Sequence, residues 1–463
     1  MDLRMLASLL GTRALWRRRD HWGEPQIRDH QDRALAVLRG YAYARSAFYR
    51  RHHAGLQGAP LTELPPVTKA QLMESFDDVV TDPQVRLADV EAHLSELVRS
   101  EGDPGQPWRG RWWAAQTAGT TGRRGVFVWD RREWSTVLAS YARANDWAEV
   151  PAGLTRPLSV AVVSSRLPTH QSAVVGATLD SRFVPTLRLD ATAPRAETVA
   201  ALNRFQPRLL VGYASALRPL AAEQQAGRLA IRPQRVVSAS EVLAPSAAKE
   251  MEEAWGSAPL DVYAATETAG VASPCRYKNR HLYEDLLVLE PVDASGSPVP
   301  PGTVAAKLLV TVLFSRTIPL IRYELTDQLS VDGRECPCGR RFVQVSGVVG
   351  RLEDVLHLPG PSGTAEVHPN VFHAILDTAG ATGWQVRQEA DGLTVLLAGP
   401  PPDVALVALG RELEQALERA GAGETAVRWM VVEEIPRTAL GKAPLVRALR
   451  PPSASPPMGS GTP

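Results

Sequence analysis

The spacing of apolar residues divides the chain near residue 350. The part before residue 350 contains a helical region followed by a region of mixed helices and strands. Residues 1 to about 100 favour helices, with a turn at 64–69 where Thr68 can cap the helix that follows. We expect little chemistry from this part. Between residues 112 and about 345, short apolar runs such as 158–163 and 209–211 alternate with helical patterns and end in polar or glycine-containing turns. This alternation predicts layers of helices and strands.

A second pattern begins after residue 351. Strand-like segments at 384–388 and 393–397 flank a hairpin turn at Asp391 and Gly392, and a third strand is expected at 425–432. Before that third strand, Asp403 can cap a helix whose apolar residues recur at helical spacing, namely Leu406, Leu409, Leu413 and Leu417. We therefore predict an α/β protein with a large N-terminal domain of layered α/β subdomains at 1–350, a small α+β C-terminal domain at 351–450, and a disordered tail at 451–463.

Composition and charge narrow the setting. The 463 residues are 44% hydrophobic, and 51 Lys and Arg nearly balance 50 Asp and Glu, so no overall field would attract nucleic acid or an anionic membrane. No apolar run is long enough to span a bilayer. The short apolar stretch at the N-terminus is interrupted by Arg4 and Arg13 and followed by Arg17, Arg18 and Arg19, which is the wrong order for a secretory signal. We expect a cytoplasmic protein, and the sequence leaves a homodimer open.

A loop at 117–124, with the sequence TAGTTGRR, combines the groups that a polyphosphate needs. It lies between strand-like runs at 111–116 and 126–129. Glycines let backbone N–H groups approach an anion, while Thr and Arg side chains donate further hydrogen bonds. The loop lacks the G-K-[ST] ending of a Walker loop, and a plain hairpin turn is the alternative explanation. The candidate phosphate ligands are Thr117, Gly119, Thr120, Thr121, Gly122 and Arg123.

Five further segments carry groups suited to a nucleotide: SASE at 238–241, YAATET at 263–268, PLIRYELTD at 319–327, GRLED at 350–354 and IPRTALGK at 435–442. Considered singly, they have ordinary structural explanations. Thr266 could cap a helix, Asp327 could end a strand, and Lys442 could be a solvated residue. The carboxylate of Asp327 is also suited to a vicinal diol, because it can accept two hydrogen bonds.

In this order, the motifs resemble those of the adenylate-forming superfamily, and specifically its phenylacetate–CoA ligase branch. They extend from Thr117 to Lys442, about seven tenths of the chain. The resemblance implies ATP and Mg²⁺ as cofactors, with Thr266 at the α-phosphate and Glu267 on the metal. It implies nucleoside contacts from Ser240, Glu241, Tyr263, Asp327 and Arg351. It also implies a mobile small domain that turns at Glu353 and delivers the catalytic Lys442.

Three positions depart from the family pattern. Arg123 replaces the usual Lys, Ala264 the usual Gly, and Glu353 the usual Asp. These changes keep open a non-catalytic nucleotide-binding scaffold as the alternative to an enzyme. The retained Lys442, Glu267 and Asp327 favour the enzyme, because a scaffold needs no lysine delivered by a mobile domain.

The resemblance also indicates the substrates. It implies an aryl or arylacetic acid, which residues 167–172 with His170 could border, and CoA as the acceptor of the acyl group. An amine or a carrier-protein thiol is the alternative acceptor, because residues 357–369 form a longer segment than the turn found in the ligase branch.

All three cysteines fall in a pattern that suits zinc. Cys275 and His281 are separated by five residues, and only Pro337 separates Cys336 from Cys338. These four residues supply the Cys₃His set of a closed, structural zinc site, and some relatives of phenylacetate–CoA ligases have a similar pattern. Unrelated buried thiols are the alternative, and the odd count argues against a disulfide framework.

Overall fold

The computed structural model describes residues 3–117, 124–150, 157–348, 350–351, 354–361, 363–367, 369–377, 379–399, 403–438 and 442–449. The chain divides into a large unit, Met1–Ala118, Gly125–Leu352 and Arg437–Lys442, and a small unit formed by Gly119–Arg124, Glu353–Pro436 and Ala443–Pro463. The predicted tail at 451–463 lies outside the described residues. Across the described part of the chain, no helix combines the length and hydrophobicity needed to cross a bilayer.

Residues 1 to 100 of the large unit are helical, as predicted. The elements are α1 (Leu3–Arg19), α2 (Glu24–Arg45), α3 (Ala47–His52), the 3₁₀ turn η1 (Leu61–Glu63), α4 (Lys69–Glu74), α5 (Phe76–Val79) and α6 (Leu87–Arg99). The predicted cap of α4 is confirmed, because the hydroxyl of Thr68 accepts a hydrogen bond from the backbone N–H of Gln71.

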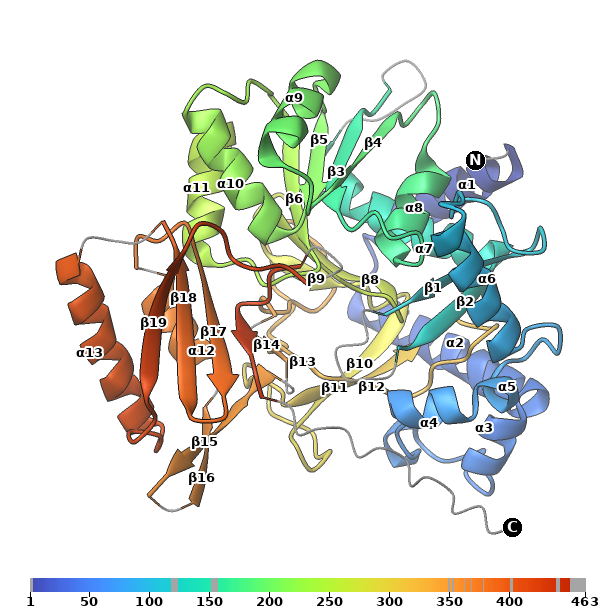
Figure 1. The fold of residues 1–463 in the computed structure, drawn as a ribbon. Helices are drawn as coiled ribbons and strands as arrows, with labels where there is room; N and C mark the ends of the chain where they lie inside the picture. Colours follow the sequence, from blue (N-terminus) through green and yellow to red (C-terminus); the bar gives the residue numbers. More distant parts are fainter. Residues whose placement is uncertain are drawn as a thin grey trace, which may run out of the picture. The chain divides into compact units, whose positions relative to one another are not determined.

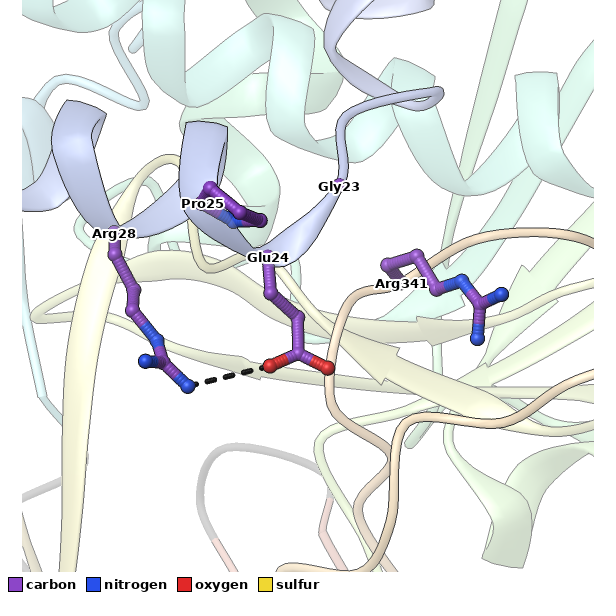
Figure 2. Close-up of a pocket in the computed structure, with 5 residues that line it drawn as sticks. All are labelled: Gly23, Glu24, Pro25, Arg28 and Arg341. Carbon is purple, nitrogen blue, oxygen red and sulfur yellow. Dashed lines mark hydrogen bonds and ion pairs between the residues drawn. The ribbon is translucent and has the colours of Figure 1, made fainter.

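The start of α2 lines a pocket together with Arg341. Its other lining residues are Gly23, Glu24, Pro25 and Arg28, and the side chains of Glu24 and Arg28, one turn apart on α2, form an ion pair of 3.2 Å (Figure 2). None of the residues predicted to bind nucleotide or metal lines this pocket.

The main sheet of the large unit has the strand order β4-β3-β5-β6-β7-β8-β9 (Figure 1). Its strands are β3 (Val160–Ser164), β4 (Thr186–Asp190), β5 (Leu209–Gly212), β6 (Arg235–Ala239), β7 (Leu260–Ala265), β8 (Ala269–Pro274) and β9 (Arg280–Leu282). Strands β3 to β7 pair in parallel, whereas β8 and β9 add antiparallel pairs. The carboxyl ends of β5, β6 and β7 therefore share one edge, where ligands of parallel sheets commonly bind.

Helices α8 (Gln171–Leu179), α9 (Arg195–Phe205), α10 (Ala214–Gln225) and α11 (Pro245–Trp255) connect these strands. Helices α10 and α11 pack side by side, and α10 also contacts β3 and β6 (Figure 1). Helices α9, α10 and α11 pack with one face of β3, β5 and β6 in one core, in which Leu210, Leu217 and Met251 are fully buried. This packing fixes the edge at which β5 and β6 end.

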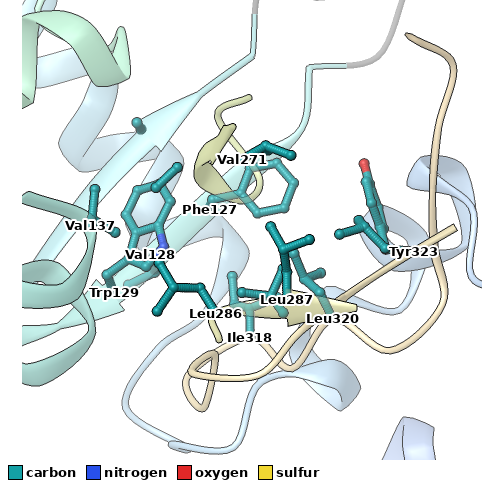
Figure 3. Packing of buried hydrophobic residues seen from close by; sticks show 14 of the residues in the cluster. Phe127, Val128, Trp129, Val137, Val271, Leu286, Leu287, Ile318, Leu320 and Tyr323 are labelled. Carbon is teal, nitrogen blue, oxygen red and sulfur yellow. The ribbon is translucent and has the colours of Figure 1, made fainter. Parts of the chain in front are cut away.

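A second part of the large unit combines the hairpin of β1 (Trp112–Gln116) and β2 (Val126–Asp130) with α7 (Arg131–Trp147). It also contains the antiparallel sheet β10 (Leu287–Val292), β11 (Lys307–Val312) and β12 (Tyr323–Leu325), and the pair β13 (Asp327–Gln328) and β14 (Gly350–Arg351). Side chains from β1, β2, α7, β10, β11 and β12 pack in one core, which includes Phe127, Leu287 and Tyr323 (Figure 3).

The small unit contains the sheet β19-β18-β17-β20, from β17 (Gly383–Glu389), β18 (Gly392–Ala398), β19 (Val427–Val432) and β20 (Val446–Arg447). Its other elements are α12 (Asn370–Leu376), α13 (Asp403–Arg419) and the hairpin of β15 (Leu356–Gly360) and β16 (Gly363–Val367). The predicted strands, the hairpin turn and the helix from Asp403 are confirmed. As the spacing predicted, Leu409, Leu413 and Leu417 are buried.

A buried ion cluster centres on Arg143 of α7, inside the large unit. Its guanidinium nitrogens lie 2.6 Å from a carboxylate oxygen of Asp20 and 2.6 Å from one of Asp285. The indole N–H of Trp147 donates to the second oxygen of Asp20 at 2.9 Å. The guanidinium also lies within 5.1 Å of the ring centroids of Trp16, Trp147, Tyr283 and Phe342. The cluster joins the end of α1 to α7 and to the segment after β9.

We predict that Arg143→Met lowers the free energy of unfolding by about 3–5 kcal/mol, because two buried carboxylates lose the guanidinium that they share, although Asp285 keeps its pair with Arg19. Denaturant titration of the purified variant measures this. The matched control is Arg33→Met, which breaks an exposed pair with Asp29 and should cost less than about 0.5 kcal/mol. Equal losses in the two variants would contradict a special role for the cluster.

Candidate active site

The base of the predicted phosphate loop is closed by paired hydrogen bonds. The backbone N–H of Thr117 donates to the carbonyl of Gly125 at 2.8 Å, and the N–H of Gly125 donates to the Thr117 hydroxyl at 2.8 Å. The preceding residue, Gln116, hydrogen-bonds Thr169 through both its backbone and its side chain. The remaining loop candidates lie outside the described residues, namely Gly119, Thr120, Thr121, Gly122 and Arg123.

The structure brings three of the predicted nucleoside residues together. The hydroxyl of Tyr263, on β7, donates to a carboxylate oxygen of Asp327, on β13, at 2.9 Å. Both side chains are buried. Asp327 is also the register partner of Arg351 across the β13–β14 pair. Tyr263 and Asp327 are 64 positions apart in the sequence, and Asp327 and Arg351 are 24 positions apart. All three belong to the large unit.

The predicted magnesium ligand, Glu267, lies in the tight turn between β7 and β8, and only 7% of it is exposed. The hydroxyl of Tyr323 lies 3.5 Å from its carboxylate, and the ammonium of Lys69 lies 3.7 Å away. Burial, and after it the nearby carboxylate of Glu267, raises the pKa of Tyr323, so its hydroxyl keeps the proton that it donates. In the same turn, the carbonyl of Thr266 accepts a hydrogen bond from the Gln171 side chain at 3.0 Å.

Ser240 and Glu241 follow the carboxyl end of β6. Ser240 has a left-handed backbone with φ of 69°, which is uncommon for a residue other than glycine. The carboxylate of Glu241 accepts hydrogen bonds from the backbone N–H of Ser215 at 2.9 Å and from its hydroxyl at 3.1 Å. Ser215 lies in the first turn of α10, so Glu241 joins the ends of β5 and β6.

The segment Arg437–Lys442 belongs to the large unit. The guanidinium of Arg437 donates to the hydroxyl of Ser215 at 2.9 Å and to its carbonyl at 2.8 Å. The ammonium of Lys442 lies 5.8 Å from the centroid of the Tyr213 ring, at the carboxyl end of β5. Burial, helped by the positive charge of Lys442, lowers the pKa of His170 to about 4, so this imidazole is neutral at pH 7.

The four predicted zinc ligands form one cluster, with their ligand atoms all within 4.8 Å of one another. The sulfurs of Cys275 and Cys336 are 3.7 Å apart, and the sulfur of Cys338 lies 3.4 Å from Nε2 of His281. A Zn–S bond of about 2.3 Å gives sulfur–sulfur separations of about 3.8 Å in a tetrahedron. The spacing therefore fits a tetrahedral zinc ion.

The surroundings of the cluster also suit a metal. Nδ1 of His281 lies 2.9 Å from the carbonyl of Phe342, which directs Nε2 toward the thiols. Burial lowers the pKa of His281, which favours the neutral form that can bind a metal. The amide of Asn279 lies 3.3 Å from the sulfur of Cys336. The cluster fits zinc in donor type, in spacing and in its second layer of hydrogen bonds.

Sequence reasoning missed two of these features. It assigned little chemistry to residues 1–100, yet Lys69 reaches the carboxylate of Glu267. It also gave no role to Arg437, although that residue lies inside the motif that ends in Lys442. The only sequence signal for Lys69 was its place directly after a capped turn, which is common at helix starts and indicates no chemistry.

No protein-family model matches the chain. A segment of 133 residues is 31% identical to a phenylacetate-coenzyme A ligase of Thermus thermophilus, covering 28% of this chain and 29% of that enzyme. The predicted resemblance to this type of ligase is confirmed over that segment. The match spans less than a third of the relative's length.

Solved structures resemble nearly the whole chain. Two postadenylation-state structures of 2-hydroxyisobutyryl-CoA ligase, with R3-HIB-AMP and with 2-HIB-AMP, match 94% of this chain and 92% of theirs, with TM-scores of 0.71 and 0.72 and identities of 20% and 19%. An open form of that ligase with 2-HIB-AMP and CoA matches with a TM-score of 0.58, covering 90% of each chain at 19% identity. These matches confirm the predicted α/β fold of adenylate-forming CoA ligases.

Proposed function

We propose that this chain activates a carboxylic acid with ATP as an acyl-adenylate and then transfers the acyl group to CoA. The observation that carries this proposal is the hydrogen bond between Tyr263 and Asp327, opposite Arg351 and in the same unit as Glu267 and Lys442. These residues come from four separate motifs of the sequence, and all four motifs contribute to the large unit.

The nucleotide contacts follow from the chemistry of each group. Asp327 accepts the two ribose hydroxyls, and Arg351 beside it adds a positive charge. Tyr263 stacks near the adenine, whose edge faces Ser240 and Glu241. The phosphates lie in the loop that begins at Thr117, where N–H groups and hydroxyls donate to them, and Thr266 contacts the α-phosphate.

Glu267 is the residue that would hold Mg²⁺, which when bound neutralises phosphate charge during the reaction. Its carboxylate suits this hard cation, and its burial limits competing water.

In the first step, a carboxylate oxygen of the acid attacks the α-phosphorus of ATP. The new oxygen–phosphorus bond forms as the bond to the β-phosphate oxygen breaks, and pyrophosphate leaves. Negative charge concentrates between two anions, and the ammonium of Lys442 stabilises it. In the second step, the sulfur of CoA attacks the acyl carbon and AMP leaves, with the small domain turning at Glu353 between the steps.

An aryl or arylacetic acid is the proposed substrate class, supported by the similarity to phenylacetate-coenzyme A ligase. The segment with His170 supports an acid site near Lys442, since the two side chains interact. A neutral His170 offers a hydrogen bond rather than a charge. Lys442 is then the cation available to the acid's carboxylate.

Pyrophosphate exchange into ATP, measured with a panel of aryl, arylacetic and short aliphatic acids, tests the first step. At least one acid should support exchange. Mass analysis after addition of CoA, amines or a carrier protein then identifies the acceptor. Tight ATP binding without exchange for any acid would favour a non-catalytic scaffold. An amide product would show that the acceptor is an amine and not CoA.

We further propose that Cys275, His281, Cys336 and Cys338 hold a structural zinc ion. Zinc would stabilise the region beyond β8 and β9, which follow the strand of Tyr263 in the same sheet. A closed set of four protein ligands leaves no open position for substrate, so the ion supplies stability and not chemistry.

For zinc, we predict close to one equivalent in protein purified without chelators and a clear loss of bound metal in Cys336→Ser. The variant should also unfold at a lower temperature, because structural zinc contributes folding energy on the order of several kcal/mol. Metal analysis and thermal unfolding measure both effects. Less than half an equivalent of zinc in unchelated protein would contradict the assignment.

For catalysis, we predict that Lys442→Ala lowers the rate of adenylate formation by at least about a hundredfold while the Kd for ATP stays within about threefold. Exchange assays and calorimetry give the two quantities. The control is Lys249→Ala, which removes an exposed lysine of α11 and should keep the original rate. An unchanged rate in the Lys442 variant would refute the proposed mechanism.

A further inference from the structure

The first residue of helix α4, Lys69, lies beside the carboxylate of Glu267. Its ammonium nitrogen is 3.7 Å from the nearer carboxylate oxygen. The side chain of Lys69 is 30% exposed, whereas that of Glu267 is 7% exposed. The pair therefore joins a buried carboxylate to a cation that still reaches solvent. A ligand arriving at Glu267 from solvent would meet this ammonium.

The segment before Lys69 is fixed to β12, a strand inside the predicted nucleotide motif at 319–327. The backbone of Val67 hydrogen-bonds the carbonyl of Arg322 and the N–H of Glu324, each at 3.0 Å. The guanidinium of Arg322 in turn donates to the carbonyls of Thr62 and Leu64 and pairs with Glu290. These bonds hold the start of α4 in one place relative to β12.

The same short helix contacts the base of the phosphate loop. The backbone N–H of Val126, the first residue of β2, lies 3.2 Å from the sulfur of Met73. The residue before it, Gly125, closes the loop base on Thr117. Helix α4 therefore touches both the strand that leaves the phosphate loop and, through Lys69, the predicted metal ligand.

We infer that Lys69 binds the β- and γ-phosphates of ATP, and the pyrophosphate that leaves. This inference rests on the proposed function. Glu267 would hold the divalent cation that accompanies a triphosphate, and the ammonium of Lys69, 3.7 Å from that carboxylate, would supply a second positive charge for phosphate oxygens. With a cation at Glu267, the ammonium of Lys69 would be able to turn from the Glu267 carboxylate to phosphate oxygens, because its flexible stem permits a small movement.

The competing explanation is that Lys69 only balances the charge of a buried Glu267. The two explanations predict different effects of losing Lys69 on the binding of ATP and of AMP. AMP lacks the β- and γ-phosphates, so a phosphate contact affects ATP and spares AMP. A purely structural ion pair affects both nucleotides alike, because losing it disturbs the turn that carries Glu267.

We predict that Lys69→Met weakens binding of magnesium–ATP by about ten- to hundredfold, the usual size of a lost charge-assisted hydrogen bond. The Kd for AMP should stay within about twofold. Calorimetry on the full chain measures both values. Lys69→Arg should restore most of the ATP affinity because it keeps the charge, and Lys249→Met is the control for loss of an exposed lysine in the same unit.

A kinetic comparison separates this inference from the proposed function. In Lys69→Met, pyrophosphate exchange should fall, whereas acyl transfer from a supplied acyl-adenylate should stay within about twofold, since that step involves no pyrophosphate. Equal losses for ATP and AMP, or no loss for either, would overturn the inference. Absence of exchange in the unmodified protein with every acid would instead overturn the proposed function.

Discussion

The site depends on the need to neutralise a buried carboxylate. Glu267 is almost fully covered by protein, and a charge taken out of water is stable only beside a partner. The fold supplies two such partners from distant parts of the sequence, the ammonium of Lys69 and the hydroxyl of Tyr323. Both are held by the bridge between Val67 and Tyr323. The N-terminal helices thus complete the side of the site that a divalent cation and phosphates would approach.

The Cys₃His cluster and the ion cluster around Arg143 form one connected region. The ring of Trp147 packs edge-on against that of His281 and stacks on Phe342. The carbonyl of Phe342 lies within hydrogen-bonding distance of Nδ1 of His281. The guanidinium of Arg143 lies over the same indole. A metal at the cysteines would therefore stabilise the packing between α7 and the antiparallel edge of the main sheet, two strands from Tyr263.

Sequence patterns predicted elements better than contacts, for a physical reason. Hydrophobic spacing is local, so helix α13 with Leu413 and Leu417, and the hairpin at Asp391, could be predicted. The candidate nucleotide residues Tyr263 and Asp327 and the cysteine set could be proposed because their motifs are specific. The contact between Lys69 and Glu267 could not be predicted, because the two residues are 198 positions apart. Their contact depends on how Val67 pairs with Tyr323. The clustering of Arg143 with Asp20 and Asp285 could not be predicted either, because these residues are far apart in the sequence and their charge does not indicate that they are buried.

On the proposed function, the two lysines would divide the charge of the reaction between them. Pyrophosphate departure moves negative charge toward the β-phosphate, where Lys69 extends from a helix fixed by backbone bonds at Val67. Attack by the acid builds charge at the α-phosphate, where Lys442 extends from the segment that Arg437 joins to Ser215. The first cation belongs to helix α4, whereas the second belongs to a segment with no helix or strand at its described residues. On the proposed mechanism this difference suits a reaction of two steps, because the cation beside the adenylate must move away before the second nucleophile attacks.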